Sequence, residues 1–183
     1  CLLYGMISRL DHGVGVVLDA LEKLGLQENT VVVFTSDNGP EFMSDYLTRP
    51  THTERFNCNL RGSKGSVYEG GIRVPLMVRW PAGILGGMSV GFMAHFTDWF
   101  TTLLSLAGTD IPRDRVIDGV DLVPAFQGNE ANLPDERFWQ WNRYSPVPSC
   151  NAAMRQGDWK LVYPEIPEAM KVFDVEWLQV SMY

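Results

Sequence analysis

The sequence predicts an α/β fold that is followed by a small antiparallel subdomain. Apolar residues recur every three or four positions over residues 6–24, which is the period of an amphipathic helix. A short run of β-branched residues then covers residues 30–35, as is typical of a strand buried on both faces of an α/β sheet. After about residue 128 the pattern changes to short strands and turns. We therefore divide the chain into an α/β part, residues 1–127, and an antiparallel subdomain, residues 128–183.

The first helix is predicted to end at Gly25, because glycine readily takes the left-handed conformation that closes many helices. The strand at residues 30–35 runs directly into Ser36-Asp37-Asn38-Gly39-Pro40. Such a cluster predicts a turn at the carboxyl end of the strand. Because open α/β sheets bind their ligands at that end, this turn is the first candidate site.

Two loops follow the turn. Residues 41–60 are polar and irregular, and a connection of that length in a compact domain usually carries a function or is mobile. Residues 61–71 hold four glycines around Lys64. The second loop is therefore able to bring its backbone close to another group.

A second strand and a second helix are predicted next. Residues 72–80 are typical of a buried strand, with a proline near the start that marks an edge or a bend. The spacing of apolar residues then predicts a helix that begins at Thr97 or Asp98 and stops at Gly108. Residues 109–124, rich in Pro, Asp and Gly, are interpreted as a linker.

The C-terminal subdomain is predicted from three short strand-like segments. Residues 138–141 and 152–154 have strand character, and residues 156–158 are typical of a hairpin turn that returns through residues 159–163. These segments predict a small antiparallel sheet.

The composition limits the classes of function. The chain has 183 residues, of which 45% are hydrophobic and 20% charged, so it is able to bury a core. The 15 basic and 22 acidic residues give a net charge of −7, which argues against nucleic acid as a partner. No apolar run reaches the roughly 18 residues of a membrane span. The three cysteines show neither a zinc motif nor a disulfide framework.

Asp37 and Asn38 are the candidate metal ligands. Carboxylate and amide oxygens are the ligands that a hard divalent cation prefers. An ordinary Asp-Asn-Gly turn has the same sequence, so both interpretations stay open. Two oxygens do not hold calcium or magnesium by themselves, so a metal site here needs further ligands from elsewhere.

Lys64 is the candidate anion-binding residue. Its glycine-rich loop lets backbone N–H groups approach an anion, and the ammonium group supplies positive charge. A solvated lysine in a flexible loop is the alternative. We expect Glu69 and Arg73 to pair and to fix this loop. Of the histidines, His52 in the long connection is the one best placed for a substrate contact.

Several segments together closely resemble the C-terminal half of a type I sulfatase of the arylsulfatase and N-acetylgalactosamine-6-sulfatase kind. They are NTVVVFTSDNGP, LRGSKGSVYEGGIRVPLMVRWPAGI, TDWFTTLLSLAG, DGVDLVPAFQG and MRQGDWKLV, in this order. The resemblance extends from about residue 4 to residue 163. It implies an alkaline-phosphatase-like sulfatase fold, in which residues 1–127 are the C-terminal part of the α/β domain.

The resemblance also implies roles for individual residues. Asp37 and Asn38 take the place of two calcium ligands, and Lys64 takes the place of the lysine that contacts the substrate sulfate and stabilises charge on the transferring group. The implied substrate is a sulfated small molecule or glycan. The implied location is the periplasm or outside the cell, and the lysosome is disfavoured because the sequence has no N-x-[ST] glycosylation site. The oligomeric state is not predicted.

One part of the family pattern is missing. The family nucleophile is a formylglycine made within a C-x-P-S-R motif, and neither Cys1, Cys58, Cys150 nor any serine lies in such a motif. We expect the chain, which starts with Cys1, to be an internal piece of a longer sulfatase, without turnover when isolated. A phosphatase or phosphonate monoester hydrolase of the same superfold, and a non-catalytic calcium- or glycan-binding relative, are the alternatives.

Overall fold

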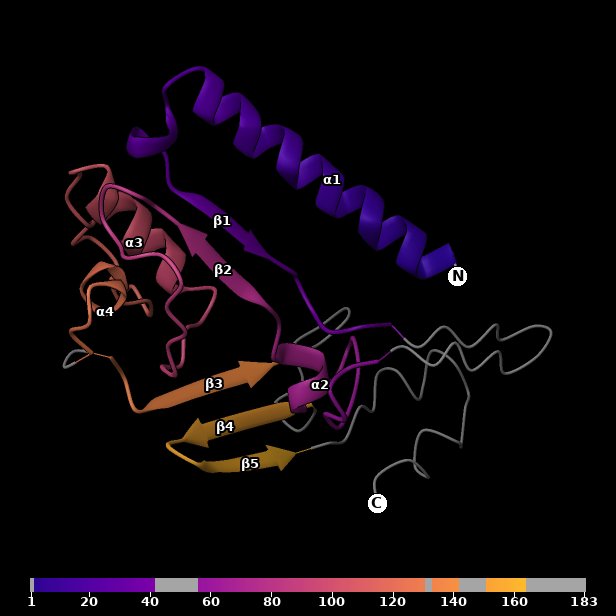
Figure 1. Cartoon of the computed structure of the whole chain (residues 1–183). Coiled ribbons are helices and arrows are strands. Elements are labelled where there is room, and N and C mark those ends of the chain that lie inside the picture. The colour runs from indigo at the N-terminus through magenta and orange to yellow at the C-terminus, as the bar shows by residue number, and fades with distance from the viewer. Residues whose placement is uncertain (1, 42–55, 131–132, 142–150, 164–183) are drawn as a thin grey trace. The chain divides into compact units, whose positions relative to one another are not determined.

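The computed structural model describes residues 2–41, 56–130, 133–141 and 151–163 of the chain (Figure 1). The chain divides into two compact units. The first unit combines residues 1–34 with residues 76–133, and the second combines residues 35–75 with residues 134–183. The subdomain boundary after residue 127 stays a prediction.

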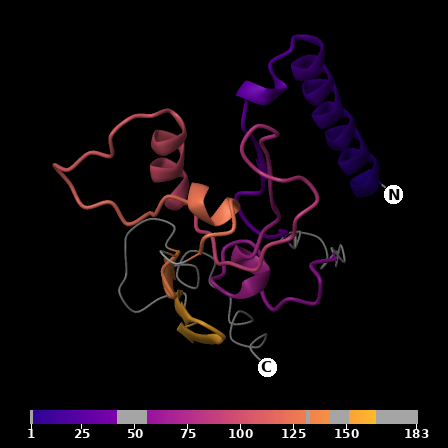
Figure 2. The same cartoon turned by 60° about the vertical axis from the view of Figure 1, so that its left-hand side comes forward.

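The first unit begins with the long helix α1 (Leu2–Lys23), which the short 3-10 helix η1 (Gln27–Asn29) follows (Figure 2). Gly25 has a φ of 66°, and its N–H donates to the carbonyl of Glu22 at 2.9 Å. The N–H of Leu26 donates to the carbonyl of Leu21 at 2.8 Å. These two bonds form a Schellman motif, so the predicted stop at Gly25 is confirmed.

A two-stranded sheet joins β1 (Val32–Thr35) to β2 (Leu76–Arg79), and Figure 1 shows that the two strands run in opposite directions. Val33 is 36% exposed and Thr35 is also exposed. The side chains of β1 therefore alternate between half-buried and exposed, and the described residues do not show the predicted burial of both strand faces.

The strand predicted at residues 72–80 is wrong at its start. The short helix α2 (Glu69–Ile72) occupies the first of these positions, and β2 begins only after Pro75. Proline has no N–H to offer a strand ladder, which accounts for the late start. Gly70 and Gly71 are both buried, and the absence of side chains lets α2 form a tight turn there.

Helix α3 (Asp98–Leu106) lies beside the short helix α4 (Val123–Phe126) in the first unit (Figures 1 and 2). The N–H of Gly108, at a φ of 64°, donates to the carbonyl of Ser105 at 3.0 Å, so the predicted stop at Gly108 is confirmed. The predicted linker at residues 109–124 is wrong at its end, because Pro124 lies within the first turn of α4, where its missing N–H is tolerated.

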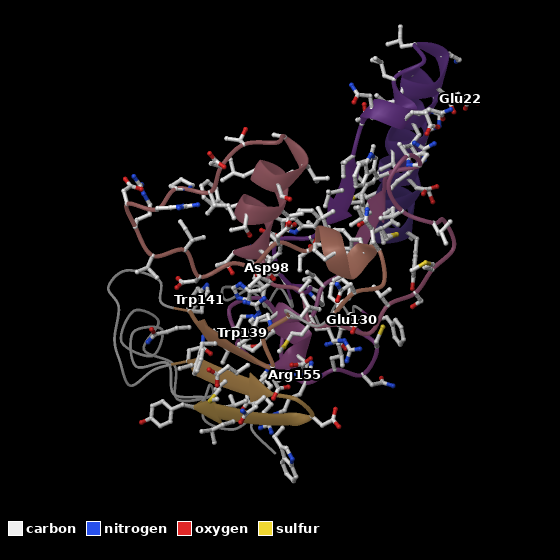
Figure 3. The ribbon with its side chains drawn as sticks, turned by 90° about the vertical axis from the view of Figure 1, so that its left-hand side faces the viewer. Glu22, Asp98, Glu130, Trp139, Trp141 and Arg155 are labelled. Carbon is white, nitrogen blue, oxygen red and sulfur yellow. The ribbon has the colours of Figure 1, made fainter. Side chains whose placement is uncertain are left out.

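Buried polar groups connect these two helices. The carboxylate of Asp98, which is fully buried, accepts the N–H groups of His95 at 2.7 Å and Val120 at 3.0 Å (Figure 3). The hydroxyl of Thr102 donates to the carbonyl of Asp98 at 2.7 Å and accepts the N–H of Leu122 at 3.0 Å. The start of α3 is therefore held by its contacts with residues near α4 rather than by the side chain of Thr97, which makes no cap hydrogen bond.

The second unit contains a three-stranded antiparallel sheet in the order β3-β4-β5, made of β3 (Glu136–Gln140), β4 (Ala152–Gln156) and β5 (Trp159–Tyr163). Met154 faces Phe138 on one side and Leu161 on the other. Gly157 has a φ of 53° in the two-residue turn between β4 and β5, where a hairpin favours glycine. The predicted antiparallel hairpin is confirmed.

Among the described residues, no helix combines the length and the apolar character that crossing a membrane requires.

Candidate functional site

Two segments of the second unit form the candidate site. One is the turn at residues 36–40, called the DNG turn below, and the other is the glycine-rich loop at residues 61–71. The N–H of Gly39 donates to the carbonyl of Gly71 at 2.8 Å, and the N–H of Lys64 donates to the carbonyl of Pro40 at 3.0 Å. These backbone bonds bring the predicted metal ligands and the predicted anion-binding lysine into one place.

The DNG turn is stabilised by its own side chains. The hydroxyl of Ser36 donates to the carbonyl of Asn38 at 2.9 Å, and Oδ1 of Asp37 accepts the N–H of Asn38 at 2.9 Å. Nδ2 of Asn38 donates to the carbonyl of Gly39 at 2.9 Å. In the described part of the chain, Oδ2 of Asp37 and Oδ1 of Asn38 accept no hydrogen bond. Both oxygens are therefore available to a cation.

These two oxygens do not complete a metal site. Within the described residues, no group of three or more His, Cys, Asp or Glu side chains is arranged to hold a metal ion. Calcium takes about six to eight oxygen ligands. Any cation at the DNG turn therefore needs ligands from outside the part of the chain that the structure describes.

Lys64 lies in a tight turn at Ser63–Ser66, called the lysine turn below. The N–H of Ser66 donates to the carbonyl of Ser63 at 3.0 Å, and Gly65 has a φ of 83°. A positive φ at the third residue is what a type II turn requires, which explains the glycine after the lysine. Lys64 occupies the second position of this turn.

The ammonium group of Lys64 is accessible. Nζ of Lys64 lies 3.4 Å from Oε2 of Glu41, and the two side chains are 48% and 56% exposed. An ion pair in such an exposed position contributes about 0–1 kcal/mol. An anion is therefore able to replace Glu41 as the partner of Lys64 at a small cost in free energy.

Close backbone approach explains two glycines of the site. A Cβ added to Gly39 would lie 1.7 Å from the carbonyl oxygen of Gly70, and one added to Gly71 would lie 2.1 Å from the carbonyl oxygen of Ser66. No larger residue fits at either position without moving the backbone. The glycines thus allow the DNG turn and the glycine-rich loop to touch.

Asn151, which the sequence analysis missed, holds the lysine turn from the other side. Its Nδ2 donates to the carbonyl of Gly65 at 2.7 Å, and its Oδ1 accepts the N–H of Val67 at 3.2 Å. Asn151 is only 1% exposed. A single asparagine before a strand carries no sequence signal for such a contact, because its partners lie more than 80 positions away.

Glu69 pairs differently from the prediction. Its carboxylate lies 2.6 Å from Nζ of Lys160 and 4.0 Å from a terminal nitrogen of Arg155, while Arg73 is exposed. Nζ of Lys160 also lies 5.4 Å from the centre of the Trp139 ring, and Figure 3 shows Trp139 and Arg155 on the antiparallel sheet. Glu69 is a structural residue, as expected, but it fixes the loop to β4 and β5.

His52, predicted to contact substrate, lies outside the described residues. The described part of the site therefore contains Asp37, Asn38 and Lys64 of the four predicted site residues. Their roles as ligands or as catalytic groups stay predictions.

Two family models match the chain. The model described as Sulfatase matches residues 3–109, and the model described as N-sulphoglucosamine sulphohydrolase, C-terminal, matches residues 63–177. Together they include the DNG turn, the glycine-rich loop and the antiparallel sheet.

Curated relatives are similar over most of the chain. Steryl-sulfatase of Mus musculus is 38% identical over 153 residues, which are 84% of this chain and 23% of the relative. N-acetylgalactosamine-6-sulfatase of Canis lupus familiaris is 41% identical over 124 residues, which are 68% of this chain and 23% of the relative. The chain thus spans about a quarter of the length of these relatives.

Solved structures have the same fold. The structure of Ps i-CgsB in complex with k-i-k-neocarrahexaose matches with a TM-score of 0.72 and 32% identity, over 87% of this chain and 33% of the other. The structure of BT4656 in complex with its substrate D-Glucosamine-2-N, 6-O-disulfate matches with a TM-score of 0.65 and 25% identity, over 85% and 29%. The predicted alkaline-phosphatase-like sulfatase fold is confirmed.

Proposed function

Because the chain belongs to the sulfatase family, we propose that it supplies part of the calcium and sulfate binding site of a sulfuric ester hydrolase. The observation that carries this proposal is the pair of backbone hydrogen bonds between the DNG turn and the glycine-rich loop, Gly39 to Gly71 and Lys64 to Pro40. They hold two side chains with hard oxygen atoms, those of Asp37 and Asn38, and the ammonium group of Lys64 on adjacent segments. A metal-bound sulfate needs both kinds of group.

Asp37 and Asn38 are proposed as calcium ligands. Their remaining side-chain oxygens suit a hard cation, and Asp37 is exposed at the turn, so a cation is able to approach it. A bound calcium ion would polarise the sulfate oxygens and favour attack at sulfur. The turn's own hydrogen bonds hold the two side chains before the ion arrives, which lowers the cost of ordering the ligands.

Lys64 is proposed to bind the sulfate group and to stabilise the negative charge that grows on it during transfer. As the bond from sulfur to the leaving oxygen breaks, charge builds on the sulfate and leaving-group oxygens, and a nearby ammonium group lowers the energy of that state. The exposed position of Lys64 and its weak pair with Glu41 support this role. His52 is proposed as a further substrate contact.

The nucleophile is proposed to come from outside this sequence. The family uses a formylglycine, and the 183 residues contain no C-x-P-S-R motif from which one is made. This chain by itself is therefore expected to have no turnover. The substrate is proposed to be a sulfated glycan or a sulfated small molecule, since BT4656 is described with D-Glucosamine-2-N, 6-O-disulfate as its substrate. The location is proposed as the periplasm or the cell exterior.

The test is turnover by the full-length protein that contains this chain, with an aryl sulfate and an aryl phosphate as parallel substrates. We expect hydrolysis of the sulfate, loss of that activity after calcium removal and its return with added calcium. Lys64→Ala is expected to lower kcat/KM by about 100-fold, the order of magnitude for loss of one charge-stabilising group.

The matched control is Lys23→Ala, since Lys23 is an exposed lysine at the end of α1 in the first unit. It should keep wild-type kcat/KM. Turnover of the phosphate alone would assign the phosphatase alternative. Calcium binding without turnover of either ester would assign the non-catalytic alternative.

A further inference from the structure

Asn151 connects the lysine turn to the antiparallel sheet. It directly precedes β4, and its side chain makes two hydrogen bonds to the backbone just after Lys64. One bond runs from Nδ2 to the carbonyl of Gly65, and the other runs from the N–H of Val67 to Oδ1. The amide of Asn151 thus binds both a backbone acceptor and a backbone donor of the same turn.

These bonds are made in a buried environment. Asn151 and Val67 are each only 1% exposed. If the amide is removed, the carbonyl of Gly65 and the N–H of Val67 lose their partner in a place that water reaches poorly. The lysine turn must then either shift toward water or keep unsatisfied polar groups. In both cases its position becomes less well defined.

The backbone of Asn151 is adapted to this contact. Its φ is 41°, in the left-handed region that asparagine tolerates better than most residues, and its carbonyl accepts the N–H of Trp141 at 3.1 Å. The backbone of Asn151 is therefore held at the start of β4, the central strand of the sheet, while its side chain reaches the turn.

We propose that Asn151 is a positioning residue for Lys64. The lysine turn is attached on one side to the DNG turn, through the bond from Lys64 to Pro40, and on the other side to Asn151. These attachments fix the point from which the Lys64 side chain extends. This inference rests on the proposed role of Lys64 as the residue that binds sulfate.

Asn151→Gly is the main test variant, because glycine accepts a φ of 41° and the change removes the whole side chain, including the amide that makes both hydrogen bonds. Asn59→Gly is the matched control: Asn59 has a φ of 59°, is exposed, and makes no side-chain hydrogen bond within the described residues. Asn151→Asp is a second variant of nearly the same shape, which keeps the acceptor for Val67 and loses the donor to Gly65.

The variants are compared in the full-length protein by kcat/KM for an aryl sulfate. Asn151→Gly and Asn151→Asp are each expected to lower it by about 10-fold or more, since a small displacement of a catalytic contact has an effect of this order. Asn59→Gly should keep the wild-type value. Hydrogen exchange at the Val67 amide should become faster in Asn151→Gly and remain unchanged in Asn59→Gly.

A double-mutant cycle with Lys64→Ala separates positioning from a general loss of structure. If Asn151 acts through Lys64, Asn151→Gly should lower kcat/KM by less than about twofold when Lys64 is already alanine. The same 10-fold fall in both backgrounds would overturn the inference, and so would wild-type activity of both Asn151 variants. If Lys64→Ala alone leaves sulfate turnover unchanged, the proposed function fails first, and that result does not depend on any Asn151 variant.

Discussion

Replacing Gly39 with alanine forces a methyl group into the contact between the DNG turn and the glycine-rich loop. The added Cβ would lie 1.7 Å from the carbonyl oxygen of Gly70, whereas real Cβ atoms essentially never come within 3.0 Å of another atom. The two segments must therefore separate by about 1.3 Å, the difference between these distances. A shift of that size lengthens or breaks the 2.8 Å bond from Gly39 to Gly71.

The expected loss of stability in Gly39→Ala follows from the added methyl group and the weakened hydrogen bond. Forcing an extra methyl group into a tightly packed place costs about 1–3 kcal/mol, and losing a backbone hydrogen bond costs about 1 kcal/mol more. We expect Gly39→Ala in the full-length protein to lower the free energy of unfolding, measured by urea denaturation, by about 2–4 kcal/mol. Sulfate-ester turnover by the same variant should fall as well.

The control for this prediction is Gly86→Ala. A Cβ at Gly86 meets no atom within 4 Å, and the φ of Gly86 is not positive. The free energy of unfolding of the Gly86→Ala variant should therefore stay within about 0.5 kcal/mol of the wild-type value. If Gly39→Ala also stays within that range, the close approach of the two segments is not as described, and the reasoning is refuted.

Two further predictions concern charged side chains that differ in burial. Glu69→Gln should lower the free energy of unfolding by about 1–3 kcal/mol, because it removes the charge that faces Lys160 at 2.6 Å in a largely buried place. Glu41→Gln, in the exposed pair with Lys64, should lower it by less than about 1 kcal/mol. Equal effects of the two changes would contradict this ranking. Asp98→Ala should lower the free energy of unfolding by about 3 kcal/mol or more, because it leaves the N–H of Val120 without its acceptor. Urea denaturation measures this change. A loss of stability below about 1 kcal/mol would contradict the buried hydrogen-bond network.

The ends of two helices and the hairpin were predictable from individual residues and their immediate neighbours in the sequence. Gly25 and Gly108 both close a helix in the left-handed conformation, and Gly157 turns the hairpin, because the missing side chain acts within a few residues of the position itself. The predicted start of the strand at residue 72 was wrong because it depends on contacts beyond its immediate neighbours. Ile72 lies instead at the end of α2, in which Gly70 packs against the backbone carbonyls of Arg61 and Gly62.

The long-range contacts of the site could not be predicted from residue spacing or hydrophobic periodicity. Glu69 was assigned to Arg73, four positions away, but its partner Lys160 lies 91 positions along the chain. Asn151 has no pattern around it that indicates a contact with Gly65. The candidate roles of Asp37 and Lys64 came from the resemblance to sulfatases, since physical reasoning alone left an ordinary turn and a solvated lysine open.

We propose above that the DNG turn and the lysine turn form one site for calcium and sulfate. A crystal structure of the full-length protein with calcium and inorganic sulfate tests it most directly. We expect oxygens of Asp37 and Asn38 at about 2.3–2.6 Å from the calcium ion, and Nζ of Lys64 at about 2.7–3.2 Å from a sulfate oxygen. Calcium bound at other residues, or sulfate bound without Lys64, would contradict the account.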